Sequence, residues 1–255
     1  MCHTAIQNIY KYYKSLSKDD NNQWFSWVDK RLRFTITRAN KFFISVMLDQ
    51  GQRADRAWDG GDHMVENHFK HKNGFWYGIS ETSLGKVTKI CKRGYLGKSY
   101  ASNYNYNKMP LWLKSAANRI LAEYNGDPRN IWKIPQGNIS LIYDRLKEFD
   151  GIGDALAKMG QFLLVRSYGV AGGQDSQHLL SIKPDILVSR VMYRTGISPS
   201  SKVKDVIAST DKLCLSSPAD FDAAAWMIGR DYCRKSSPKC VCCPISEGCR
   251  RVGLT

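Results

Sequence analysis

Residues 140–165, SLIYDRLKEFDGIGDALAKMGQFLLV, decide the fold of this chain. Apolar residues recur at helical spacing on both sides of a central turn, Phe149-Asp-Gly-Ile-Gly153. The two glycines permit a tight turn and let backbone amides come close to a bound group. The positive N-terminal end of the second helix suits an anion such as phosphate. The stretch predicts two helices joined by a hairpin that can hold phosphate, although the same glycines also occur in ordinary inter-helix turns.

Composition narrows the class of partner. The 255 residues carry a formal net charge of +15, with 43% hydrophobic and 24% charged residues, as in a soluble globular protein. A cationic surplus of this size indicates a polyanionic partner, with DNA or RNA ahead of an anionic membrane surface. The alternative is a basic protein without such a partner. No apolar run approaches the ~20 residues of a membrane span, and the N-terminal residues lack the apolar core of a signal peptide, so an intracellular protein is expected.

Four cysteines near the C-terminus form a compact set. They read C-x6-C-x2-C-x5-C, at Cys233, Cys240, Cys243 and Cys249. Structural disulfides are rare in a reducing compartment, so this spacing favours a metal centre over disulfide bonds. Four thiolates suit either zinc or an iron–sulfur cluster, and the spacing alone leaves both open. Cys242 is interpreted as a spare thiol.

A single carboxylate stands between the hairpin and the cysteines. Asp185 follows Pro184 and precedes an apolar helix, which makes it a good helix N-cap. A capping carboxylate that also faces a cleft could stabilise positive charge that develops on a sugar. From this segment alone, capping is the simpler role.

Helical patterns cover most of the remaining chain and predict an all-α protein. Asn40 is expected to cap a buried helix that contains Phe42 and Leu48. Residues 59–110 are predicted to be irregular, and their tyrosines lie among lysines, as in some surfaces that stack bases. The other helices are expected at residues 1–20, 111–124, 139–149, 152–165, 186–193 and 221–228.

Taken together, four segments resemble the endonuclease III and MutY family of helix-hairpin-helix DNA glycosylases. In chain order they are Val46-Met-Leu-Asp-Gln-Gly-Gln52, Phe149-Asp-Gly-Ile-Gly153, Asp185 with Arg190-Val-Met-Tyr-Arg-Thr195, and Gly229-Arg-Asp-Tyr-Cys233 with the cysteine loop. The resemblance covers roughly residues 40–56 and 140–250 and is most specific in the cysteine spacing. Residues 57–138 match less clearly and form a longer region than is usual in the family.

The resemblance implies two helical domains, a six-helix domain with the hairpin and an iron–sulfur cluster domain, with a DNA-binding cleft between them. Residues 1–38 would be N-terminal helices that pack with the cluster domain. Residues 39–180 would form the six-helix domain, and residues 181–255 would contain the catalytic segment and the cluster.

Site residues follow from the same resemblance. Asp185 would be the catalytic aspartate, and Gln50 would fill the gap left by a flipped nucleotide. Gly151, Ile152 and Gly153 would contact phosphate through the hairpin. The four cysteines would hold a 4Fe–4S cluster.

The chain also departs from the family pattern. The bifunctional lyases carry a lysine two residues after the second hairpin glycine, because an amine must attack the sugar there, and this chain has Ala155. Adenine glycosylases carry a glutamate as general acid where this chain has Ser45. The hairpin proline is replaced by Asp150, and the histidine of the aspartate segment by Leu187. Ser45, Ala155 and the neighbouring Asp49 are kept as pocket candidates, although no spacing assigns Asp49 a role.

These departures predict a monofunctional DNA N-glycosylase that excises a damaged or modified base from duplex DNA and leaves an abasic site. The expected protein is a monomer in the cytoplasm, associated with the nucleoid, or in the nucleus, and does not bind membranes. Two alternatives stay open: a bifunctional glycosylase and lyase of the endonuclease III type, and a catalytically silent DNA-binding member of the family.

Overall fold

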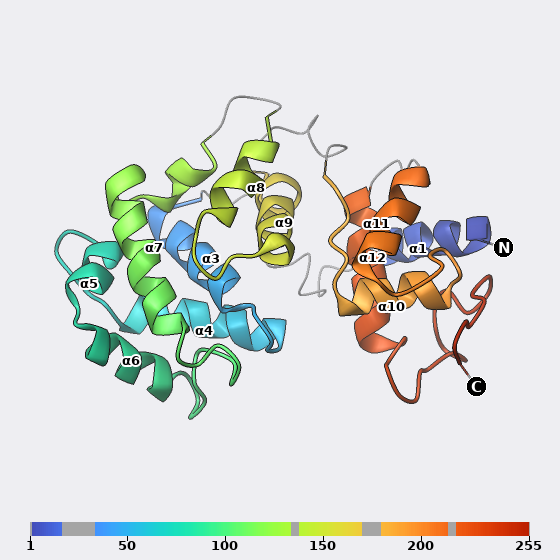
Figure 1. Cartoon of the computed structure of the whole chain (residues 1–255), viewed down its shortest axis with the longest axis horizontal. Coiled ribbons are helices and arrows are strands. Elements are labelled where there is room, and N and C mark those ends of the chain that lie inside the picture. Colours follow the sequence, from blue (N-terminus) through green and yellow to red (C-terminus); the bar gives the residue numbers. More distant parts are fainter. Residues whose placement is uncertain (1, 17–33, 134–137, 170–179, 214–217, 255) are drawn as a thin grey trace. The chain divides into compact units, whose positions relative to one another are not determined.

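A computed structural model describes residues 2–16, 34–133, 138–169, 180–213 and 218–254 of the chain. Within these residues all regular elements are helices, apart from an isolated bridge between Tyr95 and Lys98, which confirms the all-α prediction. No helix in this part of the chain is both long and apolar enough to cross a bilayer. The chain divides into a terminal unit (Met1–Lys30, Val165–Tyr168 and Gly173–Thr255) and a central unit (Arg31–Leu164 with Gly169–Gly172) (Figure 1).

The helices of the central unit follow one another along the chain, with no helix of the terminal unit between them. They are α3 (Ile36–Leu48), α4 (Ala54–Asn67), α5 (Phe75–Glu81), α6 (Leu84–Arg93), α7 (Met109–Glu123), the 3-10 helix η1 (Pro128–Ile131), α8 (Ser140–Lys147) and α9 (Asp154–Phe162). A π-helical turn, η2 (Leu163–Ser167), follows α9. The apolar helix α3 is the centre of this unit and packs against α4, η1 and α9. Its fully buried Phe43 ring meets Phe149, the first residue of the hairpin turn, with centroids 4.8 Å apart.

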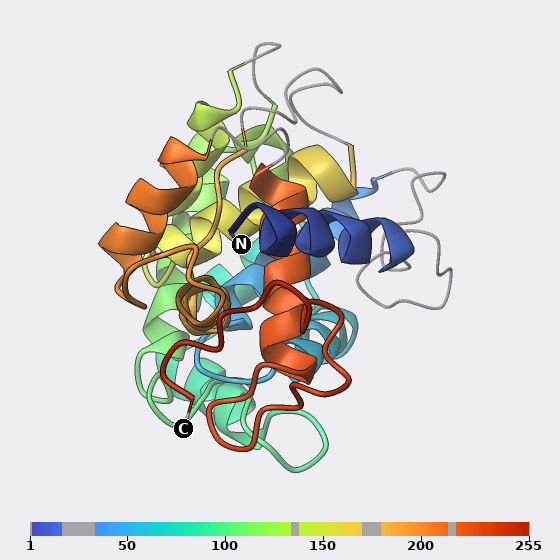
Figure 2. The ribbon, with the colours of Figure 1, turned by 90° about the vertical axis from the view of Figure 1, so that its right-hand side faces the viewer.

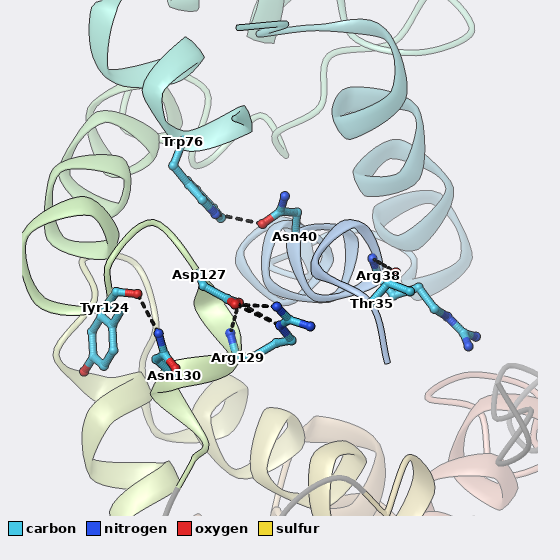
Figure 3. A network of polar contacts seen from close by, with 8 residues as sticks. All are labelled: Thr35, Arg38, Asn40, Trp76, Tyr124, Asp127, Arg129 and Asn130. Atoms are coloured by element: carbon cyan, nitrogen blue, oxygen red, sulfur yellow. Dashed lines mark hydrogen bonds and ion pairs between the residues drawn. The ribbon is translucent and has the colours of Figure 1, made fainter. Parts of the chain in front are cut away.

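Helix α3 begins earlier than predicted. Thr35 is its N-cap and accepts a hydrogen bond from the Arg38 amide (3.3 Å). The prediction that Asn40 caps this helix is therefore wrong. Asn40 is instead buried inside the helix, where its Oδ1 accepts from Trp76 Nε1 at 2.8 Å and so ties α3 to α5 (Figure 3). A buried indole N–H needs an acceptor, and the short amide supplies it.

The prediction that residues 59–110 are irregular is wrong for half of them, which lie in α4, α5 and α6. Gly60 and Gly61 weaken the helical signal of α4, yet both serve its packing. A Cβ on Gly61 would lie 2.1 Å from Ser45 Oγ and 3.0 Å from the Ser45 backbone. The glycine thus permits the close approach of α3 and α4, a tertiary requirement that local propensity does not reveal.

The terminal unit combines both ends of the chain. It contains α1 (Cys2–Leu16), α10 (Ile186–Arg194), α11 (Val203–Lys212) and α12 (Pro218–Asp231). Helix α1 lies beside α12, which also packs against α10 (Figure 2). The shared core is entirely buried: Ile9, Tyr13, Ile182, Val188, Val191, Met192, Val206, Phe221, Ala224, Ala225, Ile228 and Ile245.

The predicted helices of both units are confirmed with shifted ends. The second hairpin helix begins at Asp154 rather than at residue 152, and α12 extends beyond residues 221–228 in both directions. Helix α11 was not predicted. Residues 17–20, predicted as part of the first helix, lie outside the described residues. The three-part domain boundaries and the cleft stay predictions.

Candidate functional site

The hairpin turn has the geometry that its two glycines permit. Gly151 has a φ of +86°, and a Cβ there would lie 2.6 Å from the Trp112 ring. Gly153 is the extended N-cap of α9 (φ −86°), and nothing lies within 4 Å of a Cβ built on it. The Ile152 side chain is buried, and its amide donates to Phe149 O at 3.0 Å. Gly151 is thus required by the fold, whereas Gly153 keeps the outer face of the turn open.

We expect Gly151→Ala to lower the free energy of unfolding by roughly 2–4 kcal/mol, since strain at positive φ and overpacking each cost about 1–3 kcal/mol. Gly153→Ala should change stability by less than about 0.5 kcal/mol but weaken duplex binding, if the phosphate contact predicted from the sequence lies at this open face. Denaturant unfolding and duplex titration of both variants measure the two effects. Equal destabilisation by the two substitutions would contradict this assignment.

Two carboxylates flank the hairpin. Asp150, in place of the family's proline, accepts a hydrogen bond from Ser115 Oγ at 2.7 Å. Asp154 opens α9 and pairs with Lys147 Nζ (2.6 Å) while accepting from Tyr143 Oη (2.8 Å). The hydrogen bond from Lys147 holds the pKa of Asp154 below its usual value. The positive end of α9 is therefore already partly offset by a carboxylate of the chain itself.

Gln50, the predicted gap-filling residue, lies against the hairpin. Its Nε2 donates to Gly151 O and to Met47 O (3.2 Å), and its Oε1 accepts from Asn105 Nδ2 (3.3 Å). The side chain is half-buried. The structure thus brings together two predicted site residues that lie far apart in the sequence, and it adds Asn105, which no sequence signal had indicated. The gap-filling role itself stays a prediction.

The three pocket candidates lie in different environments. Ser45 is fully buried, and its Oγ contacts Trp58 O at 3.4 Å in the α3–α4 contact. Asp49 ends α3, and its amide donates to Ser45 O at 3.0 Å. Ala155 is exposed in the first turn of α9. The structure gives Ser45 a packing role, and the pocket roles stay predictions.

Asp185 caps α10, as predicted. Its Oδ1 accepts from the amides of Leu187 and Val188, both at 2.8 Å. Among the described residues no donor binds Oδ2, and the residue is half-buried. The neighbouring Ile186 side chain is 76% exposed. One carboxylate oxygen is therefore fixed by the helix, while the other has no donor among the described residues.

The four cysteines of the predicted centre line one hollow in the terminal unit. Cys233, Cys240, Cys243 and Cys249 all border this hollow, and the exposed Cys242 does not. Burial raises the pKa of the Cys243 thiol to about 11, and the charges of the other three thiols add to this effect. Among the described residues, no group of three or more His, Cys, Asp or Glu side chains is placed to hold a metal ion. In chemical type the four thiols match the ligands of an iron–sulfur cluster, in which each iron takes one thiolate.

Two arginines of α10 hold the cysteine loop. Arg190 donates to Cys233 O (2.6 Å) and Gly229 O (3.0 Å). Arg194 is only 8% exposed and donates to Cys233 Sγ (3.6 Å), Arg234 O (2.5 Å) and Lys235 O (3.0 Å). No described carboxylate lies within 4.0 Å of Arg194.

A buried guanidinium without a carboxylate needs another anion. The Arg194 side chain lines the same hollow as the thiols, and thiolates with a bound cluster would supply negative charge there. This agreement is a second reason why the residues present fit the cluster. The sequence contained this signal, since the two arginines lie four residues apart on one helix, but they had no assigned role.

The tyrosines of the region between α6 and α7 divide into two groups. Tyr100 is 3% exposed, with its hydroxyl 2.5 Å from His63 Nδ1, and Tyr95 packs on the same imidazole at 4.6 Å. Tyr104 is 85% exposed, and Lys108 Nζ lies 5.7 Å from its ring centroid. Only part of the predicted aromatic surface is therefore accessible to a ligand.

The arrangement of helices, with a glycine hairpin in the central unit, defines the chain as having the fold of helix-hairpin-helix DNA glycosylases. No protein-family model matches the chain, and no curated protein matches it significantly. Solved structures do match it.

An endonuclease III in a non-covalent complex with DNA is similar over 96% of this chain and 95% of that chain, with 17% identity and a TM-score of 0.61. A thermostable thymine-DNA glycosylase is similar over 96% and 93%, with 17% identity and a TM-score of 0.60. An 8-oxoguanine glycosylase/lyase of Clostridium acetobutylicum, in complex with double-stranded DNA, is similar over 84% and 76%, with 13% identity and a TM-score of 0.51. At these identities the likeness establishes the fold, as the resemblance in sequence predicted.

Proposed function

We propose that the chain is a DNA glycosylase that removes a damaged or modified base from duplex DNA. The observation that carries the proposal is Asp185, a carboxylate with one oxygen fixed by two helix amides and one oxygen unbound among the described residues. Support also comes from the hairpin with Gln50 bonded to it and from a fold shared with solved glycosylases, some of them bound to DNA.

Each proposed step uses groups of the chain itself. The hairpin amides hold a phosphate and fix the register of the duplex without reading its sequence. The target nucleotide leaves the stack, and the Gln50 amide fills the gap after it releases Gly151 O and Asn105. The C1′–N bond breaks, and its electron pair leaves with the base. The Asp185 carboxylate stabilises the positive sugar, and a water oxygen then bonds to C1′ while the proton that this water loses passes through solvent to the released base.

We propose that the reaction is monofunctional. A lyase needs an amine that attacks C1′, and the hairpin position where the family carries it holds Ala155. Without a carboxylic acid at position 45, the excised base is one that leaves readily, such as an alkylated or otherwise electron-poor base. Borohydride reduction on an abasic duplex should give no covalent adduct, whereas an adduct would favour the bifunctional alternative.

We further propose a 4Fe–4S cluster at Cys233, Cys240, Cys243 and Cys249. When bound, the cluster would supply a rigid anionic centre that shapes the basic loop around it. Purified protein should be brown and contain iron, and Cys243→Ser should lose both properties. Zinc in a colourless protein would contradict the proposal.

The test of the activity is base release. The protein is incubated with duplexes that contain normal, damaged and hypermodified bases, and free bases are measured by mass spectrometry. Release from at least one duplex is expected, with an abasic site that alkali converts to a strand break. No release from any duplex, with duplex binding retained, would favour the catalytically silent alternative.

A further inference from the structure

The central unit contains a long stretch without any carboxylate side chain. Residues 82–122, between Glu81 and Glu123, include neither aspartate nor glutamate. Its cations are Lys86, Lys89, Lys92, Arg93, Lys98, Lys108, Lys114 and Arg119. The whole chain carries 23 acidic residues, so an acid-free stretch of this length concentrates positive charge in one part of the fold.

Two of these cations have structural partners. Lys114 donates to the carbonyls that end α5, including Thr82 O at 2.9 Å. Arg119 pairs with Glu123 (3.3 Å) and Glu148 (3.2 Å). Neither is available to a ligand without the loss of these bonds.

The remaining six cations are exposed, and no described carboxylate lies within 4.0 Å of any of them. We call them the α6 face: Lys86, Lys89, Lys92, Arg93, Lys98 and Lys108. On α6 itself, only Val87 and Cys91 are buried. The helix thus binds the core through one narrow stripe, and it directs all of its charge to solvent. The cations repel one another, a cost that an anion would relieve.

Hydrogen bonds hold this face beside the proposed site. The loop that follows α6 is joined to Gln50 through Asn105 (3.3 Å). The side chain of Gln52 donates to Tyr100 O at 2.9 Å, and Arg56 donates to Ser99 O at 2.6 Å. Asn105 and Tyr100 are themselves buried. The loop is therefore a fixed extension of the segment that carries Gln50.

Two cations of the α6 face lie over tyrosine rings of the loop that follows α6. Lys92 Nζ lies 5.2 Å from the Tyr106 ring centroid, and Lys108 Nζ lies 5.7 Å from that of Tyr104. Such contacts restrict a flexible ammonium group without neutralising its charge. The face is therefore cationic, ordered at one end and continuous with the residue that bonds to the hairpin.

We propose that the α6 face binds phosphates of the duplex outside the hairpin contact and extends the footprint of the protein along the DNA backbone. The inference rests on the proposed function in one respect, since duplex DNA is the ligand of both. Lysines on a helix and a loop bind phosphate as point charges, so this contact contributes affinity without base preference.

The test compares two triple variants with the same change in charge. Lys86→Gln/Lys89→Gln/Lys92→Gln alters the α6 face, and Lys202→Gln/Lys204→Gln/Lys212→Gln alters exposed lysines at α11 in the terminal unit. Each lowers the formal charge of +15 by three. Duplex affinity is measured by fluorescence anisotropy over a salt series from about 50 to 200 mM.

The α6 variant should lose about tenfold or more in affinity, and the slope of log K against log salt should fall by roughly 2–3, near one per lost phosphate contact. The α11 variant should change the slope by less than about one. The substitution of the same α6 lysines by arginine should retain binding. Thermal unfolding should change little in all three, because none of these side chains has a hydrogen bond or an ion pair among the described residues, and only Lys92 has a ring contact, with Tyr106.

Equal losses in the two glutamine variants would show that net charge alone acts, and would overturn the proposal. An unchanged slope in the α6 variant would overturn it as well. The glycosylase proposal is tested by a different result. If the wild type binds the duplex but releases no base, that proposal is wrong, and the salt slopes still test the role of the α6 face.

Discussion

Asp185→Asn should reduce base release by at least roughly 100-fold, the loss expected when one preorganised group no longer stabilises transition-state charge. Asparagine caps a helix about as well as aspartate, so α10 should keep the amide contacts of Leu187 and Val188. The variant should therefore fold and bind duplex DNA normally. Single-turnover base release, with enzyme in excess, isolates this effect from product release.

Asp127→Asn is the matched control, because Asp127 also caps a helix: its Oδ1 accepts from the Arg129 amide at 2.9 Å in η1 of the central unit (Figure 3). Like Asp185→Asn, this substitution replaces a capping carboxylate by an amide, but it should leave base release intact. Full activity of Asp185→Asn would mean that the carboxylate only caps the helix, and the proposed mechanism would be wrong.

Arg194→Met should cost about 3 kcal/mol of unfolding free energy or more and should release most of the iron of the proposed cluster. The substitution leaves Arg234 O and Lys235 O without their donor and removes the buried cation beside Cys233. The backbone at this residue also accepts from Cys249 Sγ (3.6 Å), so a shift of α10 here would disturb both ends of the cysteine loop. Iron analysis and thermal unfolding measure the two losses.

Arg251→Met separates this effect from charge alone, since Arg251 borders the same hollow with an exposed side chain. It should retain iron and stability. Arg194→Lys keeps the charge but lacks the planar fork that serves several acceptors, so an intermediate loss is expected. If Arg194→Met keeps its iron and its stability, the arginine is not a partner of the cluster.

Sequence patterns predicted the fold where helices are apolar and periodic. The buried stripe of α3, the two hairpin helices and α10 all carried this signal. The same reasoning failed for α4 and α6. Gly60 and Gly61 suppress helical propensity in α4 but allow it to meet Ser45 and Tyr100 closely, and α6 buries only two side chains. Packing against distant segments stabilises α4, whereas α6 carries a helical period in its own short sequence, with Val87 and Cys91 buried four residues apart.

The candidate site shows the same division. The N-cap geometry of Asp185 and the positive φ of Gly151 follow from local chemistry, and both were predictable. The bonds that join Gln50 to Asn105 and to Gly151 depend on contacts between distant segments, so the sequence could not indicate them. The packing role of Ser45 was also hidden, because its partner Gly61 lies on another helix.

The pairing of α1 with α12 has a consequence for biosynthesis. Helices α3 to α9 follow one another without interruption, so the central unit can fold as soon as they leave the ribosome, in the usual N-terminal order. Helix α1 emerges earlier, yet its buried Ile9 and Tyr13 find their partners only when α12 has been made. The apolar face of α1 therefore stays without its core through most of translation, and the proposed cluster could form only after the last cysteine has been synthesised.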